Sequence, residues 1–211
     1  MTDIHRRIGI DFDNTLARYD NVFYEASRSA GFTDLKPRQS KQQIRDHIRK
    51  QPNGDDHWQR LQAQVYGHRM AEAELFEGVG PFFHACMTSD VEIFIVSHKT
   101  EFAKYDPDGP NLREKALQWM GDKRFFDQSG YGISKSNVYF EATRREKIAR
   151  IVNLNLSLFI DDLEEVFLES DFPENVEALH FSSEYSGLSQ NPFTSYRNWT
   201  DIANAIFPAS R

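Results

Sequence analysis

The chain has 211 residues, of which 39% are hydrophobic and 27% are charged. This length accommodates one well-buried core, or a core with a small accessory domain, and the composition is too apolar for a disordered protein. The formal net charge of −7 argues against nonspecific binding to nucleic acid or to an anionic membrane as the main activity.

No stretch approaches the roughly 20 apolar residues that span a bilayer, and the basic residues near the start have no apolar region behind them. The single cysteine, Cys86, excludes an intramolecular disulfide. These features predict a cytoplasmic protein that does not enter membranes. They leave its oligomeric state open.

The first apolar run, residues 8–10, predicts a buried strand that leads directly into Asp11-Phe12-Asp13-Asn14-Thr15. In an extended chain the side chains of Asp11 and Asp13 would point to the same face. Two carboxylates held together repel each other, so such a pair usually needs a divalent cation or a shared proton. A turn with Asp residues capping backbone donors is the alternative for this pair taken alone.

Residues 17–77 differ from the rest of the chain, because they are polar and contain no strand-like run. Their helical periodicity is broken at Pro37 and at residues 52–56, which predicts a helical insertion, or cap, after the first strand. The basic run at residues 38–50 is interpreted as a solvated face, with binding of an anionic substrate as the alternative. A second insertion, residues 101–109, is predicted to be a turn-rich loop.

Strand-like and helical patterns alternate through the remainder, which indicates a mostly parallel sheet with helices on both faces. Further strands are predicted at residues 91–96, 138–140, 156–160 and 176–181. Helices are predicted at residues 79–88, 112–120, 143–152, 163–169 and 198–207. Ligands of such sheets bind beyond the carboxyl ends of the strands.

Polar residues stand at those carboxyl ends. The run at 91–96 leads into Ser97-His98-Lys99, and the run at 156–160 leads into Asp161-Asp162. Carboxylate oxygens suit Mg²⁺, whereas His and Cys residues at zinc spacing are absent from the sequence. For Lys99 two alternatives stay open, contact with a substrate anion or exposure to solvent. The histidines outside these motifs, among them His5 and His180, are predicted to have surface or packing roles.

The helix at 143–152 begins with Thr143 and Glu146 in a capping-box pattern, which places Lys147 in its first turns. Asp11-Phe12-Asp13-Asn14-Thr15 resembles the first motif, DxDxT, of the haloacid dehalogenase superfamily. Ser97 matches that family's second motif, Lys147 its third, and Asp161-Asp162 its acidic fourth, in the family's order. Three other basic residues compete with Lys147 for the third motif: Lys135, Lys115 and Arg144.

The resemblance implies an α/β fold, a Rossmann-like three-layer α/β/α core with a parallel sheet in the strand order 3-2-1-4-5. The core would comprise residues 1–16 and 78–211, and residues 17–77 would form the helical cap. It also implies a Mg²⁺-dependent phosphatase that hydrolyses a phosphomonoester of a small metabolite through an aspartyl-phosphate intermediate.

The resemblance also implies roles for individual residues. Asp11 would be the nucleophile, and Asp13 the acid and base that protonates the leaving oxygen and then deprotonates water. The dehalogenase branch of the family has no acid at the position that corresponds to Asp13. Asp13 therefore favours phosphoryl transfer over carbon–halogen cleavage. The expected phosphate-binding residues are Ser97, Lys147, Asn14, Thr15 and His98. The expected Mg²⁺ ligands are Asp11, Asp13 through its backbone carbonyl, Asp161 and Asp162.

Three alternative functions stay open. A phosphatase on a nucleic-acid end or a phosphoprotein would need an open site with a basic track near Asp11. A non-catalytic module would keep the fold and bind magnesium or a partner. Cleavage of a carbon–phosphorus bond would need a cap lysine as a Schiff base, and no sequence feature marks Lys36, Lys41 or Lys50 for that role.

Overall fold

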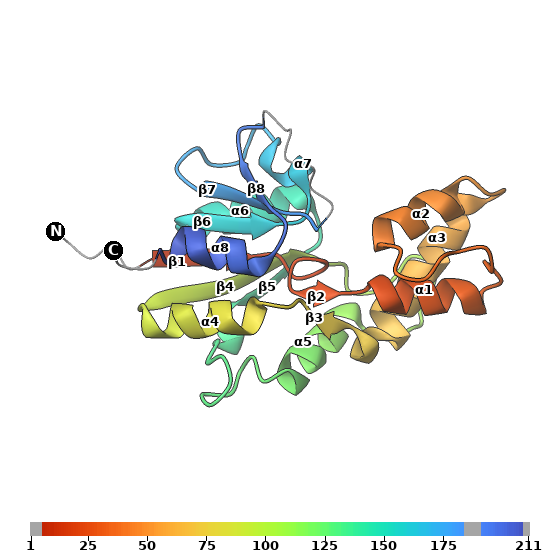
Figure 1. Cartoon of the computed structure of the whole chain (residues 1–211), viewed down its shortest axis with the longest axis horizontal. Helices are drawn as coiled ribbons and strands as arrows, with labels where there is room; N and C mark the ends of the chain where they lie inside the picture. Colours follow the sequence, from red (N-terminus) through yellow and green to blue (C-terminus); the bar gives the residue numbers. More distant parts are fainter. Residues whose placement is uncertain (1–5, 184–190, 209–211) are drawn as a thin grey trace. The chain divides into compact units, whose positions relative to one another are not determined.

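The computed structural model describes residues 6–183 and 191–208, and the chain divides into two compact units (Figure 1). The first unit comprises Met1–Ala17, Leu75–Lys99 and Lys123–Arg211, and the second comprises Arg18–Glu74 and Thr100–Asp122. None of the described helices is long and apolar enough to cross a membrane. The prediction for His5 lies outside the described residues.

A fully parallel sheet forms the centre of the first unit, in the order β5-β4-β1-β6-β7-β8. Its strands are β1 (Arg6–Ile10), β4 (Val91–His98), β5 (Val138–Glu141), β6 (Leu158–Asp161), β7 (Glu177–Phe181) and β8 (Thr194–Tyr196). The predicted strand order 3-2-1-4-5 is therefore confirmed. The edge strand β8 was not predicted, because its three residues, Thr-Ser-Tyr, form no apolar run.

Helices cover both faces of this sheet: α4 (Val79–Thr88) and α8 (Trp199–Ile206) lie on one face, and α6 (Arg144–Asn153) and α7 (Glu164–Phe167) on the other (Figure 1). Successive side chains of a strand point to opposite faces. Phe94 accordingly packs in one cluster with Ile151 of α6, whereas Ile93 lines a pocket together with Phe83 of α4. The three-layer α/β/α architecture is thus confirmed.

The second unit is helical. It contains α1 (Asp20–Ser29), α2 (Lys41–Arg49), α3 (Gly54–Ala63), the π-helical η1 (Gln64–His68), the short 3₁₀ helix η2 (Met70–Glu72) and α5 (Leu112–Asp122). Aromatic rings fill its interior, because Phe23 stacks on Trp58 with ring centroids 4.7 Å apart, and Tyr66 meets Phe23 edge-on. Where the chain leaves the first unit and returns to it, β2 (Ala17–Arg18) pairs with β3 (Glu74–Leu75).

One segment lies in a different unit from the one its sequence pattern suggests. Thr100–Asp122 belongs to the second unit, whereas the predicted boundaries place it in the core. Helix α5 contacts η1 and η2, and the indole N–H of Trp119 donates to the carbonyl of Ala73 over 2.8 Å. These partners are distant in the sequence, so local periodicity carries no signal for them.

Candidate active site

The register of the sheet brings the polar strand ends together. Ile10 of β1 pairs with Ile95 of β4 on one side and with Ile160 of β6 on the other. The next residue, Asp11, donates its backbone N–H to the carbonyl of Ile160 over 2.8 Å and lies level with Asp161. Parallel neighbours therefore place the first, second and fourth predicted motifs at one edge of the sheet.

The loop after β1 turns sharply at Asn14, whose φ of 62° lies in the left-handed region that Asn tolerates better than most residues. The backbone N–H groups of Leu16 and Ala17 both donate to the carbonyl of Phe12 over 3.0 Å. The N–H of Asn14 donates to the carbonyl of Ala17, so its backbone donor is already engaged. A contact from Asn14 to a phosphate would therefore come from its side chain.

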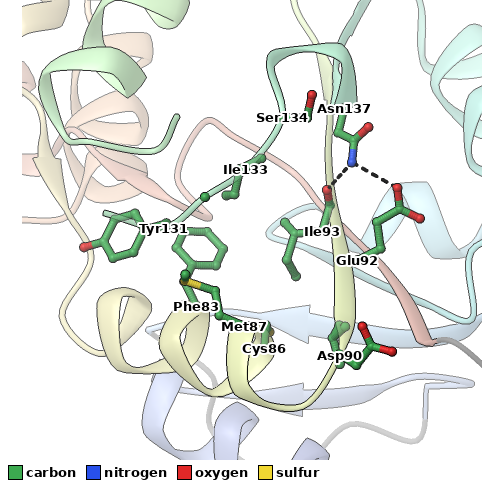
Figure 2. Close-up of a pocket in the computed structure, with 12 residues that line it drawn as sticks. Phe83, Cys86, Met87, Asp90, Glu92, Ile93, Tyr131, Ile133, Ser134 and Asn137 are labelled. Atoms are coloured by element: carbon green, nitrogen blue, oxygen red, sulfur yellow. Dashed lines mark hydrogen bonds between the residues drawn. The ribbon is translucent and has the colours of Figure 1, made fainter. Parts of the chain in front are cut away.

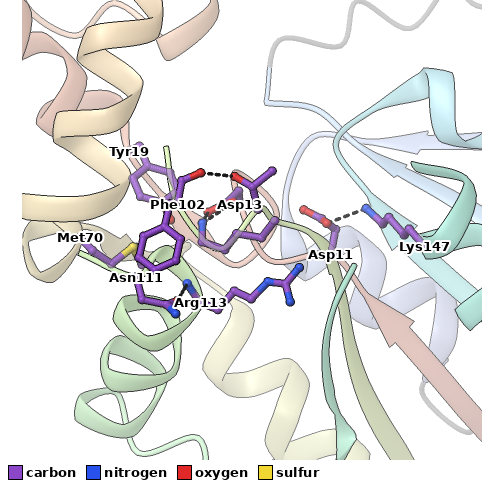
Figure 3. Close-up of polar contacts among 10 residues, drawn as sticks. Asp11, Asp13, Tyr19, Met70, Phe102, Asn111, Arg113 and Lys147 are labelled. Atoms are coloured by element: carbon purple, nitrogen blue, oxygen red, sulfur yellow. Dashed lines mark hydrogen bonds and ion pairs between the residues drawn. The ribbon is translucent and has the colours of Figure 1, made fainter. Parts of the chain in front are cut away.

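Lys147 joins two of the acidic residues, and its contact with Asp11 is drawn in Figure 3. Its ammonium nitrogen lies 2.6 Å from Oδ1 of Asp11 and 2.6 Å from Oδ2 of Asp161. The predicted capping box of α6 is confirmed, with Thr143 as the N-cap and Glu146 as its partner, and it fixes the start of the helix that carries this lysine. Among the competing basic residues, Arg144 instead pairs with Glu169.

The charges of this group are strongly coupled. Burial raises the pKa of Asp11 from 3.8 to about 7, although the Lys147 ammonium opposes that increase and the Asp161 carboxylate reinforces it. Burial by itself would lower the pKa of Lys147, but attraction to the two carboxylates outweighs it and raises the pKa above 10.5. When both carboxylates are ionised, the group carries an excess negative charge that a bound cation would neutralise.

Three carboxylates can hold a metal ion here. Asp11, Asp161 and Asp162 each offer one oxygen, and these oxygens lie within 4.8 Å of one another. A set of carboxylate oxygens fits a hard divalent cation such as Mg²⁺. The backbone N–H of Leu163 donates to Oδ1 of Asp161 over 3.0 Å, which orients that side chain. The carboxylate of Asp13 is not part of this group, so its predicted metal contact rests on its backbone carbonyl.

Two hydroxyl groups at the site are buried without a partner. Ser97 is 1% exposed and Thr15 is 0% exposed, and neither hydroxyl oxygen makes a hydrogen bond within the part of the chain that the structure describes. A buried polar atom without a partner costs about 1–3 kcal/mol. Ser97 lies near the end of β4 and Thr15 in the loop that follows β1, and their hydroxyl groups are available to a ligand with acceptor oxygens.

Lys99 is a site residue whose position the sequence left undetermined. It follows β4, is 4% exposed, and its ammonium lies 3.0 and 2.7 Å from the two carboxylate oxygens of Asp13. The alternative in which Lys99 points to solvent is therefore wrong. The ion pair joins residues far apart in the sequence, which explains why the motif pattern does not reveal it.

His98 lies beside these residues, but its ring is exposed and its Nε2 lies 2.9 Å from the backbone carbonyl of Ala142. Its predicted contact with phosphate stays a prediction. His180, by contrast, is buried, with Nε2 3.2 Å from the carbonyl of Asp162 and Nδ1 3.0 Å from Oγ of Ser195 on the unpredicted strand β8. It thereby supports the backbone of Asp162, a candidate metal ligand.

A pocket at the other end of β4 is separate from this site (Figure 2). Phe83, Cys86 and Ile93 line it, and the side-chain amide of Asn137 closes one side by donating to the carbonyl of Ile93 over 3.1 Å. Burial raises the pKa of the Cys86 thiol to about 12, so the thiol stays protonated and unreactive at neutral pH.

Comparison by sequence finds no matching family model and no matching curated protein. Solved structures do match, at low identity and over nearly the whole chain. A haloacid dehalogenase-like hydrolase from Streptococcus pneumoniae has a TM-score of 0.61 at 12% identity, with 95% of this chain and 98% of that chain covered.

Two further structures extend this likeness. A predicted phosphoglycolate phosphatase from Haemophilus somnus has a TM-score of 0.56 at 13% identity, with 95% of this chain and 97% of that chain covered. A HAD family hydrolase from Deinococcus radiodurans, with bound phosphate and sodium, has a TM-score of 0.55 at 10% identity, with coverages of 95% and 94%. At these identities the likeness establishes the fold.

Proposed function

We propose that this chain, which has the fold of the haloacid dehalogenase-like hydrolases, is a Mg²⁺-dependent phosphatase that acts on a small phosphorylated metabolite. The observation that carries the proposal is the buried group of Asp11, Lys147 and Asp161, with the Lys147 ammonium 2.6 Å from both carboxylates. Ser97, with a hydroxyl group that has no partner among the described residues, lies at the same edge of the sheet.

In the first step, a carboxylate oxygen of Asp11 forms a bond to phosphorus while the bond from phosphorus to the leaving oxygen breaks. The carboxyl group of Asp13 gives its proton to that leaving oxygen, which departs as an alcohol. In the second step, the Asp13 carboxylate takes a proton from water, and the water oxygen bonds to phosphorus. The bond between Asp11 and phosphorus then breaks and releases inorganic phosphate.

The residues around Asp11 supply charge and hydrogen bonds to the phosphoryl group. The hydroxyl of Ser97 is free to donate to a phosphoryl oxygen, and Thr15 and the side chain of Asn14 are further candidates. The ammonium of Lys147 neutralises negative charge on the nucleophile and on the phosphoryl group, and such preorganised charges are usually the largest contribution to catalysis. His98 is kept as a predicted phosphate contact.

Mg²⁺ would be held by Asp11, Asp161, Asp162 and the backbone carbonyl of Asp13. The bound ion supplies positive charge that lets an anionic phosphoryl group approach an anionic nucleophile. Two features of the chain support this choice of ion. The donors are all oxygens, and the group carries an excess negative charge when Asp11 and Asp161 are both ionised.

Several observations support a small phosphorylated substrate. One structural neighbour is called a predicted phosphoglycolate phosphatase, and another holds phosphate. The net charge of −7 is unfavourable for a nucleic-acid substrate. We assign the choice of substrate to the predicted cap, residues 17–77. A cytoplasmic setting is part of this proposal.

The test is hydrolysis of a panel of phosphorylated metabolites, together with a generic aryl phosphate, by the purified protein. We expect wild-type activity that EDTA removes and Mg²⁺ restores, and no measurable activity for Asp11→Asn. Asp171→Asn is a matched control on the surface and should keep full activity. Activity of Asp11→Asn equal to that of the wild type would exclude Asp11 as the nucleophile, and a wild type inactive on the whole panel would contradict the proposed function.

A further inference from the structure

We propose that Lys99 is a positioning residue that holds the carboxylate of Asp13 in place for both proton transfers. The proposal rests on the proposed function, because it assigns Asp13 the proton of the leaving group and then that of water. It adds a residue outside the four sequence motifs to the site.

The contact between the two side chains is close and uses both oxygens of the carboxylate. The ammonium of Lys99 lies 3.0 Å from Oδ1 and 2.7 Å from Oδ2 of Asp13. The lysine itself is anchored, since its backbone N–H donates to the carbonyl of Glu141 over 2.9 Å directly beyond the pairing of β4 with β5. Its ammonium also lies 5.6 Å from the centroid of the Phe12 ring.

This arrangement restrains the carboxylate. An ammonium bound to both oxygens opposes rotation of the carboxylate group of Asp13, which directly precedes the sharp turn at Asn14. Proton transfer depends on such positioning, because a displacement of about 1 Å at a catalytic group can lower a rate by about 100-fold. A lysine that is 4% exposed also needs a charged partner, because an unpaired buried ammonium is strongly unfavourable.

The two buried lysines of the site contact different carboxylates. Lys147 contacts Asp11 and Asp161, the proposed nucleophile and a proposed metal ligand, whereas Lys99 contacts the proposed acid and base, Asp13. The competing interpretation is that Lys99 binds an anionic group of the substrate directly. That role would require the ammonium to leave Asp13 or to share its hydrogen bonds when substrate binds.

The experiment is a double-mutant cycle with Lys99→Met and Asp13→Asn, assayed on an alkyl phosphate and on p-nitrophenyl phosphate. An alkoxide needs a proton to leave, whereas p-nitrophenolate leaves readily without one. We expect Lys99→Met to lower kcat by about 10- to 100-fold on the alkyl phosphate and by less than about 3-fold on the aryl phosphate, with KM within about 2-fold. In the Asp13→Asn background it should have no further effect.

Other outcomes overturn the proposal. If Lys99→Met raises KM on both substrates, and its effect adds to that of Asp13→Asn, Lys99 is a substrate ligand. If Lys99→Met lowers kcat equally on both substrates, its role is purely structural. Lys135→Met is the control, because Lys135 is exposed in the same unit. If Lys99→Met does not fold, Lys99→Gln is judged by the same criteria. A wild type that hydrolyses no phosphomonoester contradicts the proposed function, whereas an active wild type with an unaffected Lys99→Met contradicts this inference alone.

Discussion

At the scale of single residues, the candidate site depends on Lys147. Its side chain is 1% exposed, and its ammonium contacts the carboxylates of both Asp11 and Asp161. We expect Lys147→Met to lower kcat by about 100- to 1,000-fold, because one preorganised donor to a developing charge is worth that much. Lys135→Met should leave kcat unchanged. A loss below about 3-fold in steady-state assays would remove Lys147 from the site.

Lys147→Met should also affect stability. The substitution leaves two buried carboxylates without their ammonium, and breaking a buried ion pair in this way costs about 3–5 kcal/mol. Urea unfolding in the presence of EDTA measures this effect without a contribution from bound metal. A midpoint equal to that of the wild type would show that the pair is not formed in the metal-free protein.

The pKa of Asp11 predicts how pH controls stability and metal binding. Burial raises this pKa from 3.8 to about 7, so the folded metal-free protein binds a proton that the unfolded chain releases between about pH 4 and 7. The contribution of Asp11 to the free energy of unfolding therefore falls as pH rises through that window. Binding of Mg²⁺ to ionised Asp11 should release about one proton at pH 6 and almost none at pH 8.5.

Calorimetry in two buffers of different ionisation enthalpy measures this proton release. Asp11→Asn provides the control, because a residue without a carboxylate has no proton to release there. If the wild type releases no proton on binding Mg²⁺ at pH 6, then Asp11 is already ionised in the metal-free protein.

At the scale of elements, β1 positions Asp11, and Gly9 leaves room beside β1 for side chains of the adjacent strand β6 and of the residues just before it. A Cβ at Gly9 would overlap with Cδ1 of Leu156 and lie 2.6 Å from Cδ2 of Phe159. We expect Gly9→Ala to lower the free energy of unfolding by about 1–3 kcal/mol, as overpacking in a core usually does.

Gly121→Ala is the matched control for that substitution. Gly121 lies in the helix α5, and an added Cβ would meet no atom within 4 Å. Removing a helical glycine should leave stability unchanged or raise it by about 0.5–1 kcal/mol. Urea unfolding compares the two variants, and a Gly9→Ala midpoint at or above the wild-type value would contradict the close packing at β1.

Most elements of the first unit could be predicted from local pattern. The strands β1, β4 and β6 are short continuous apolar runs, and the start of α6 follows from its capping box, because both signals come from neighbouring residues. The edge strand β8 could not be predicted. Its extended conformation is stabilised by pairing with β7, because its own three residues form no apolar run that would predict a strand.

At the scale of the whole molecule, the chain forms two compact units, and α5 belongs to the second. Trp119 is 1% exposed, and its indole donates to the carbonyl of Ala73. We expect Trp119→Phe, which loses this hydrogen bond, to increase amide hydrogen exchange in Arg18–Glu74 more than in Leu75–Lys99. Equal changes in both segments, measured by mass spectrometry, would contradict the assignment of α5 to the second unit.

Apolar runs and a capping box are properties of adjacent residues, so the sequence alone predicts most core strands and the residues that follow them, whereas the strand order followed from the resemblance that the four motifs carry. Three features appear only in the folded chain: Lys99 pairs with Asp13, Lys147 bridges Asp11 and Asp161, and α5 packs with the second unit. Each of these contacts joins residues distant along the chain, and a buried ammonium takes its partner from whatever carboxylate the fold brings within reach.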